Sequence, residues 1–94
     1  MKKFILTSVA LFAEFGDLDS MDEPSICTNA FDTEEKAHGK MDEELKTEIN
    51  EAKAAGYESF KSESYSRTAT FENGEKGSGC SWNLVRWEIT EIEF

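Results

Sequence analysis

The sequence predicts an α+β domain, in which one amphipathic helix packs on one face of a small antiparallel sheet of about four strands. Three observations predict this class. An apolar run near the N-terminus alternates onto two faces, a capped helical pattern fills the middle of the chain, and an aromatic-rich segment ends it. The expected order of elements is β-β-α-β-β, within a single domain spanning residues 1–94.

The first strand is predicted over residues 4–15, FILTSVALFAEF, because apolar side chains fall on both alternating faces. A strand that is apolar on both faces belongs in the middle of a sheet. The same letters fit a secretory signal, since two lysines precede the run and a small-x-small triplet ends at Ala10. We favour the strand because Thr7 and Ser8 interrupt the apolar run early, and the signal stays open as the alternative.

The clearest helix signal follows a loop over 16–25 and a short second strand over 25–31. Asp32 is expected to be the N-cap, with Glu35 at the third helical position, and Gly56 is a natural C′ residue. Apolar residues recurring at three and four positions predict one buried stripe: Ala37, Met41, Leu45, Ile49 and Ala52. Gly39 is the weak point, where the helix is expected to bend or to start late.

Two further strands are predicted in the C-terminal half. Residues 58–72 carry charges and hydroxyls on both faces, which is typical of an edge strand, and NGEKGSG over 73–79 is a turn. Residues 80–94 form a long last strand whose apolar pattern changes phase, so a bulge or burial of both faces is expected there. Because the first and last strands hold most of the apolar side chains, both are placed centrally.

The chain has 94 residues and a net charge of −10, from 20 acidic and 10 basic side chains. This charge disfavours direct nucleic-acid binding, whereas it suits a basic protein partner, mimicry of nucleic-acid charge, or plain solubility. No stretch approaches the roughly 20 apolar residues that span a bilayer, so no membrane partner is expected. Two cysteines, Cys27 and Cys80, are too few for a disulfide scaffold, and buried free thiols are expected.

No catalytic, cofactor or metal site is expected. The acidic loop over 17–23 lacks the glycine and the final glutamate of a calcium-binding EF-hand. His38 lies one turn before Asp42, but it is the single histidine, so a surface residue is expected rather than a zinc ligand. Cys27 and Cys80 lie among apolar residues of predicted strands, where a thiol is inert.

One feature points to binding. A single helix covers only one face of a sheet, yet apolar residues occur on both faces of the first and last strands. A second subunit or a protein partner would cover the other face, and the candidate interface residues are Phe12, Trp82, Leu84 and Trp87. Alternatively, the 16–25 loop covers that face, or bulges rotate all of these side chains into one core.

We therefore predict a non-enzymatic interaction module that acts in the cytoplasm, by binding a protein partner or by self-association through its sheet. In general character the chain resembles the small acidic α+β proteins of bacteria, their phages and mobile elements, a resemblance specific to no family. One alternative is an exported domain, cleaved after Ala10, with a Cys27–Cys80 disulfide. A small enzyme is the other alternative, although no set of acid, base and nucleophile is recognisable.

Overall fold

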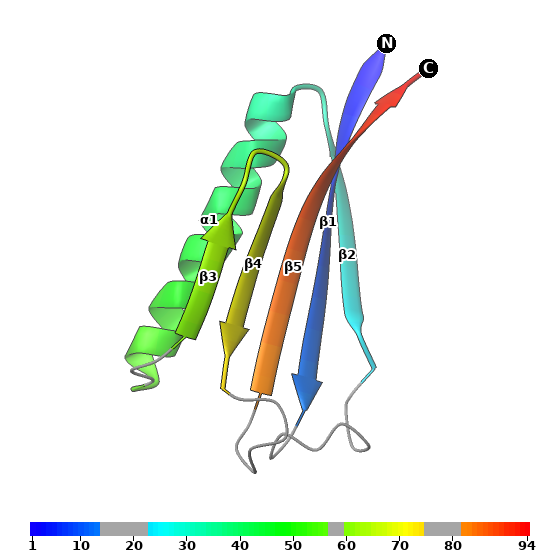
Figure 1. Cartoon of the computed structure of the whole chain (residues 1–94). Coiled ribbons are helices and arrows are strands. Elements are labelled where there is room, and N and C mark those ends of the chain that lie inside the picture. Colours follow the sequence, from blue (N-terminus) through cyan, green and yellow to red (C-terminus); the bar gives the residue numbers. More distant parts are fainter. Residues whose placement is uncertain (14–22, 57–59, 75–81) are drawn as a thin grey trace.

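The structure, a computed structural model, describes residues 1–13, 23–56, 60–74 and 82–94. Within these ranges lie six elements: β1 (Lys2–Ala13), β2 (Ser25–Phe31), α1 (Glu34–Ala54), β3 (Phe60–Ser64), β4 (Thr68–Asn73) and β5 (Trp82–Glu93). The strands build one antiparallel sheet in the order β2-β1-β5-β4-β3, and α1 lies against one face of it (Figure 1). The predicted α+β class is confirmed, whereas the described residues form five strands rather than about four.

The first and last strands lie inside the sheet, as predicted. β1 pairs with β2 on one side and with β5 on the other, and β5 also pairs with β4. The register between β1 and β5 runs without interruption from Lys2 opposite Glu93 to Ala13 opposite Trp82. The phase change in the last strand therefore needs no bulge, because apolar side chains lie on both faces of the sheet.

Apolar residues of α1 and of one sheet face form the main core. The stripe predicted for the helix is buried, with Ala37 and Met41 fully enclosed and Ile49 packed against the same cluster. The sheet contributes alternate residues of its strands: Phe4, Leu6, Ala69, Phe71, Val85, Trp87 and Ile89. Because successive strand residues point to opposite faces, these residues define the helix-covered face, and the residues between them define the helix-free face.

The helix begins one residue later than predicted. Thr33, rather than Asp32, is the N-cap, and its hydroxyl accepts a hydrogen bond from the backbone N–H of Lys36 at 3.2 Å. Asp32 pairs instead with Lys3 of β1, and this hydrogen bond lowers the pKa of the Asp32 carboxyl below its ordinary value. The Asp32 carboxylate therefore pairs with a residue of the sheet, and the hydroxyl of the next residue, Thr33, caps the helix.

The body of α1 continues through Gly39, so the helix does not start late at that glycine. At the C-terminus, the backbone N–H of Ala55 donates to the carbonyl of Glu51 at 3.0 Å. Gly56 follows with φ of +88°, which is the left-handed conformation that favours glycine at C′. The predicted C-terminal signal of the helix is confirmed.

The segment predicted as one edge strand over 58–72 contains a hairpin, and this accounts for the fifth strand. β3 and β4 pair antiparallel, and the chain reverses at Ser66 and Arg67. The Arg67 guanidinium donates to both Glu34 carboxylate oxygens at 2.9 and 3.2 Å, and the Arg67 carbonyl accepts from the Ile89 N–H at 2.8 Å. These partners are distant in sequence, and the reversal contains no Gly, Pro or Asn, so Ser66 gives only a weak local signal for a turn. The predicted edge position holds for β3.

Candidate functional site

The helix-free face is the candidate binding surface, because α1 packs against the opposite face of the sheet (Figure 1). The strand register decides which side chains belong to it. Odd-numbered residues of β1 and β3 lie there beside even-numbered residues of β2, β4 and β5. Side chains that are far apart in sequence therefore share one surface.

Aliphatic side chains gather on the part of this face formed by β2, β1 and β5. This aliphatic patch consists of Ile5, Val9, Leu11, Ile26, Ala30, Leu84 and Ile92. Val9 lies opposite Ile26, and Leu11 lies opposite Leu84, so the patch runs across strands as well as along them. Ile26 is 64% exposed and Ile92 is 45% exposed, which leaves large aliphatic surface in contact with water.

The charges of the helix-free face cancel. Its strand residues include three cations and three anions: Lys3, Lys61, Arg86, Glu63, Glu72 and Glu88. The net charge of −10 therefore comes from other residues of the chain. Seven acidic and four basic residues lie on α1, at the opposite side of the sheet. Another acidic chain can consequently approach the helix-free face without meeting net repulsion from that face itself.

A shallow depression of about 320 Å³ lies beside the aliphatic patch, over β3, β4 and β5. Leu84 contributes an apolar wall, and Lys61, Glu63, Glu72 and Arg86 also line it. An apolar wall among side chains of both charge signs can accept an aliphatic side chain and still pair its charges with another mixed surface. The helix-free face is therefore not flat, and the depression is a place where a side chain of a binding partner can insert.

The four predicted interface residues do not share one surface. Phe12 and Trp87 lie on the helix-covered face, where Trp87 is buried in the main core. Trp82 and Leu84 lie on the helix-free face, but Trp82 is buried, and its indole Nε1 donates to Glu72 Oε2 at 2.8 Å. Of the four, Leu84 alone belongs to the aliphatic patch.

Ile26 and Ile92 are patch residues that the sequence pattern did not single out. Ile26 lies in β2, whose sequence SICTNAF carries no charge although the strand is at the edge of the sheet. Edge strands usually carry charges that prevent association with other chains. The absence of charge from this edge strand was the sequence signal that could have identified Ile26. It indicates that the β2 side of the sheet is suited to contact with another chain.

Of the residues considered for chemistry, His38 and Asp42 lie together on α1, whereas Cys27 lies on β2. His38 Nδ1 lies 3.1 Å from Asp42 Oδ2, and both side chains project from α1. Cys27 is a free and exposed thiol, which corrects the expectation of a buried cysteine, because β2 lies at the sheet edge. Cys80 and residues 17–22 lie outside the described residues.

Within the part of the chain that the structure describes, no three His, Cys, Asp or Glu side chains form a group that could hold a metal ion. No helix among the same residues is long and apolar enough to span a membrane. Comparisons with protein-family models, curated proteins and solved structures found no significant match to this chain.

Proposed function

We propose that this chain is a non-enzymatic interaction module in which two copies associate by stacking their helix-free faces. The observation that carries the proposal is the aliphatic patch on the sheet face opposite α1. Stacked sheets pack about 10 Å apart, so side chains from two such faces interdigitate into a shared apolar layer. Burying this layer supplies the driving force for association.

Charge favours a second copy over a basic partner. A basic protein would be attracted to the acidic parts of the surface, such as α1 with its seven acids and four bases. The helix-free face holds as many cations as anions, so it complements a surface of its own composition. A twofold arrangement allows cations of one copy to lie near anions of the other, while the aliphatic patches meet at the centre.

The helix-free face is also large enough for a stable dimer interface. With a strand spacing of about 4.8 Å and a rise of about 3.3 Å per residue, the five strands cover a projected area of about 670 Å². Stable interfaces bury about 800 Å² of accessible surface per partner, and the accessible surface of side chains exceeds the projected area beneath them. A dimer that uses most of the face therefore reaches the usual size.

Sedimentation velocity over a concentration series tests this proposal. We expect the wild type to pass from monomer to dimer with rising concentration, and to contain more dimer at physiological than at low salt. Ile26→Lys places a charge in the aliphatic patch and is expected to raise the dimer dissociation constant about tenfold or more. Because Ile26 is mostly exposed in the single chain, the circular dichroism spectrum should not change.

Asn29→Lys provides the matched control. It lies on the same strand and adds the same charge, but it is opposite Leu6 on the helix-covered face. We expect this variant to dimerise like the wild type. A wild type that stays monomeric up to millimolar concentration would contradict the proposal, and so would equal weakening of the dimer by both lysine variants.

A further inference from the structure

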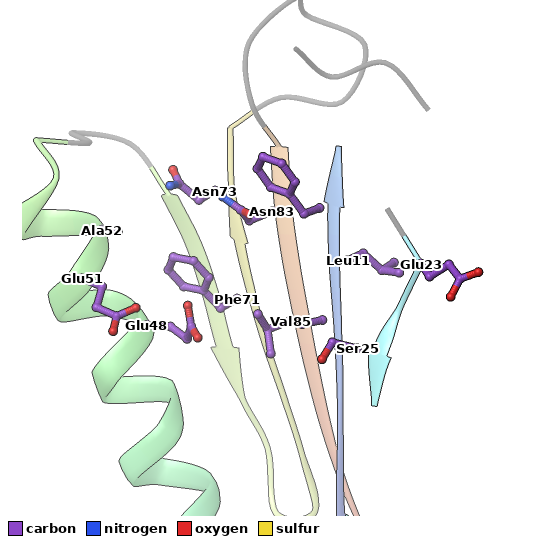
Figure 2. A pocket seen from close by; sticks show the side chains of 12 residues that line it. Leu11, Glu23, Ser25, Glu48, Glu51, Ala52, Phe71, Asn73, Asn83 and Val85 are labelled. Carbon is purple, nitrogen blue, oxygen red and sulfur yellow. The ribbon is translucent and has the colours of Figure 1, made fainter. Parts of the chain in front are cut away.

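A second hollow, of about 430 Å³, lies between α1 and the sheet on the helix-covered face (Figure 2). We call it the helix–sheet hollow. Its apolar walls include Ala10, Ala52, Phe71 and Val85. Its polar lining includes Glu23, Glu48, Glu51, Asn73 and Asn83. It therefore combines an apolar interior with a few polar groups, as small-molecule sites do.

The hollow is acidic, and its described lining holds no balancing cation. Glu48 and Glu51 extend from α1 toward Phe71 (Figure 2), Glu23 lines the β2 side, and no lysine or arginine is among the described lining residues. Burial raises the pKa of Glu48 above its ordinary value, and the neighbouring Glu51 and Glu44 raise it further. The carboxylates repel one another here, so a cation in the hollow would relieve their repulsion.

A buried hydrogen-bond acceptor also lines the hollow. The Asn73 side chain belongs to a residue that is only 4% exposed, and its Oδ1 has no hydrogen-bond partner. Buried amide oxygens normally accept a hydrogen bond, so this atom is suited to a ligand that carries an N–H donor. Asn83 lies opposite Asn73 in the register of β4 and β5 and adds a second amide to the same wall.

The form of the hollow favours an organic cation over a metal ion. Among the described residues, the acidic side chains do not converge into a group that could hold a metal. The volume far exceeds that of an ion, and the aromatic and aliphatic walls suit the carbon skeleton of a ligand. The acidic lining, the unpaired hydrogen-bond acceptor and the apolar walls therefore all favour an organic cation.

We infer that the helix–sheet hollow binds a small primary amine with an apolar body. The single positive charge of the ammonium group pairs with the carboxylates of Glu48 and Glu51 and offsets their mutual repulsion. Its N–H groups are donors suited to the unpaired acceptor Asn73 Oδ1. The apolar body lies against Phe71 and Val85. Phe71 and Val85 lie on the helix-covered face, whereas the aliphatic patch lies on the helix-free face, and Leu11 is the one patch residue that also lines the hollow. The inference is argued from the helix-covered face and does not depend on the proposed association.

Titration with phenethylamine, followed by NMR of the side-chain amides of Asn73 and Asn83, tests this inference. We expect saturable shifts of these two amides with phenethylamine, and much weaker binding of phenethyl alcohol, which has the same body without the charge. Glu48→Gln removes one carboxylate of the hollow and is expected to weaken amine binding about tenfold, as for the loss of a charge-assisted hydrogen bond.

Glu43→Gln is the matched control, because Glu43 is an exposed residue of the same helix that does not line the hollow. It should leave the amine affinity unchanged. The inference would be overturned by the absence of amide shifts at saturating amine, by equal affinity for amine and alcohol, or by displacement of the amine by magnesium or calcium at matched ionic strength. Equal weakening by Glu48→Gln and Glu43→Gln would do the same, since it would indicate general charge attraction.

Discussion

Replacing Gly39 by alanine is expected to stabilise the fold. Gly39 lies in the second turn of α1 at an exposed position, and an added Cβ would have nothing within 4 Å. Glycine inside a helix is less favourable than alanine because the unfolded glycine chain has more conformational freedom to lose. We expect the free energy of unfolding to rise by roughly 0.5–1 kcal/mol, which corresponds to about 2–8 °C in Tm for a domain of this size.

Gly56→Ala is the matched control for this prediction. An added Cβ there also has nothing within 4 Å, so neither substitution meets a steric obstacle. The backbone conformations differ, because Gly56 has φ of +88°, where a side chain costs about 1–2 kcal/mol. The same chemical change should therefore stabilise the chain at Gly39 and destabilise it at Gly56.

Urea and thermal unfolding, followed by far-UV circular dichroism, measure both effects. The dependence of the unfolding free energy on urea should be the same in the three proteins, since the surface exposed on unfolding hardly changes. A neutral or destabilising Gly39→Ala with unchanged urea dependence would refute the reasoning. So would a shift of the same sign for both variants, because backbone conformation is the difference on which the prediction rests.

Deleting residues 1–10 is expected to unfold the chain, because β1 pairs on both sides and burying a side chain such as Phe4 contributes about 1.5–3 kcal/mol; an unchanged calorimetric Tm would contradict this. Glu34→Gln should lower stability at neutral pH but not well below the ordinary pKa of 4.5, since the Arg67 hydrogen bond lowers the pKa of Glu34 and its contribution is lost as pH falls. Glu48→Gln should raise stability at neutral pH and lose its effect in acid, since a raised pKa costs stability as pH rises through it. Urea titrations at neutral pH and at a pH well below 4.5 measure the stability of the two glutamine variants against the wild type.

The helix could be predicted from the sequence because its signals are local. The spacing of Met41 and Leu45 within the stripe and the position of Gly56 depend only on residues a few places apart. The N-cap was misplaced by one residue for the opposite reason. Asp32 pairs with Lys3, which is 29 residues away in the sequence and becomes a neighbour only when β1 and β2 pair.

The sheet was predictable in its centre and not in its hairpin. Central strands reveal themselves by apolar residues on both faces, and β1 and β5 show this pattern. The reversal at Ser66 and Arg67 depends on Glu34 and Ile89, so it follows from tertiary contacts. A continuous alternating pattern therefore concealed two strands.

The candidate binding face was predictable as a property but not as a set of residues. Alternation shows that each central strand has two apolar faces, yet it does not say which face of β1 continues into which face of β5. That assignment requires the register, which places Leu84 beside Leu11 and Trp87 beside Ser8. The helix–sheet hollow gave no sequence signal, since Glu48 and Asn73 approach it from different elements.

The placement of charge explains how a chain with a net charge of −10 could associate with itself. In the proposed dimer the balanced helix-free faces meet, and the excess acids lie elsewhere, including on the outward-facing helices. At physiological salt the screening length is about 8 Å, so repulsion between acids on the far sides of two stacked sheets is largely removed. Salt should therefore strengthen the proposed dimer until this repulsion is screened, and further salt should not weaken it. A contact made by attraction between opposite net charges would instead weaken steadily with salt, so the salt dependence identifies which force joins the chains.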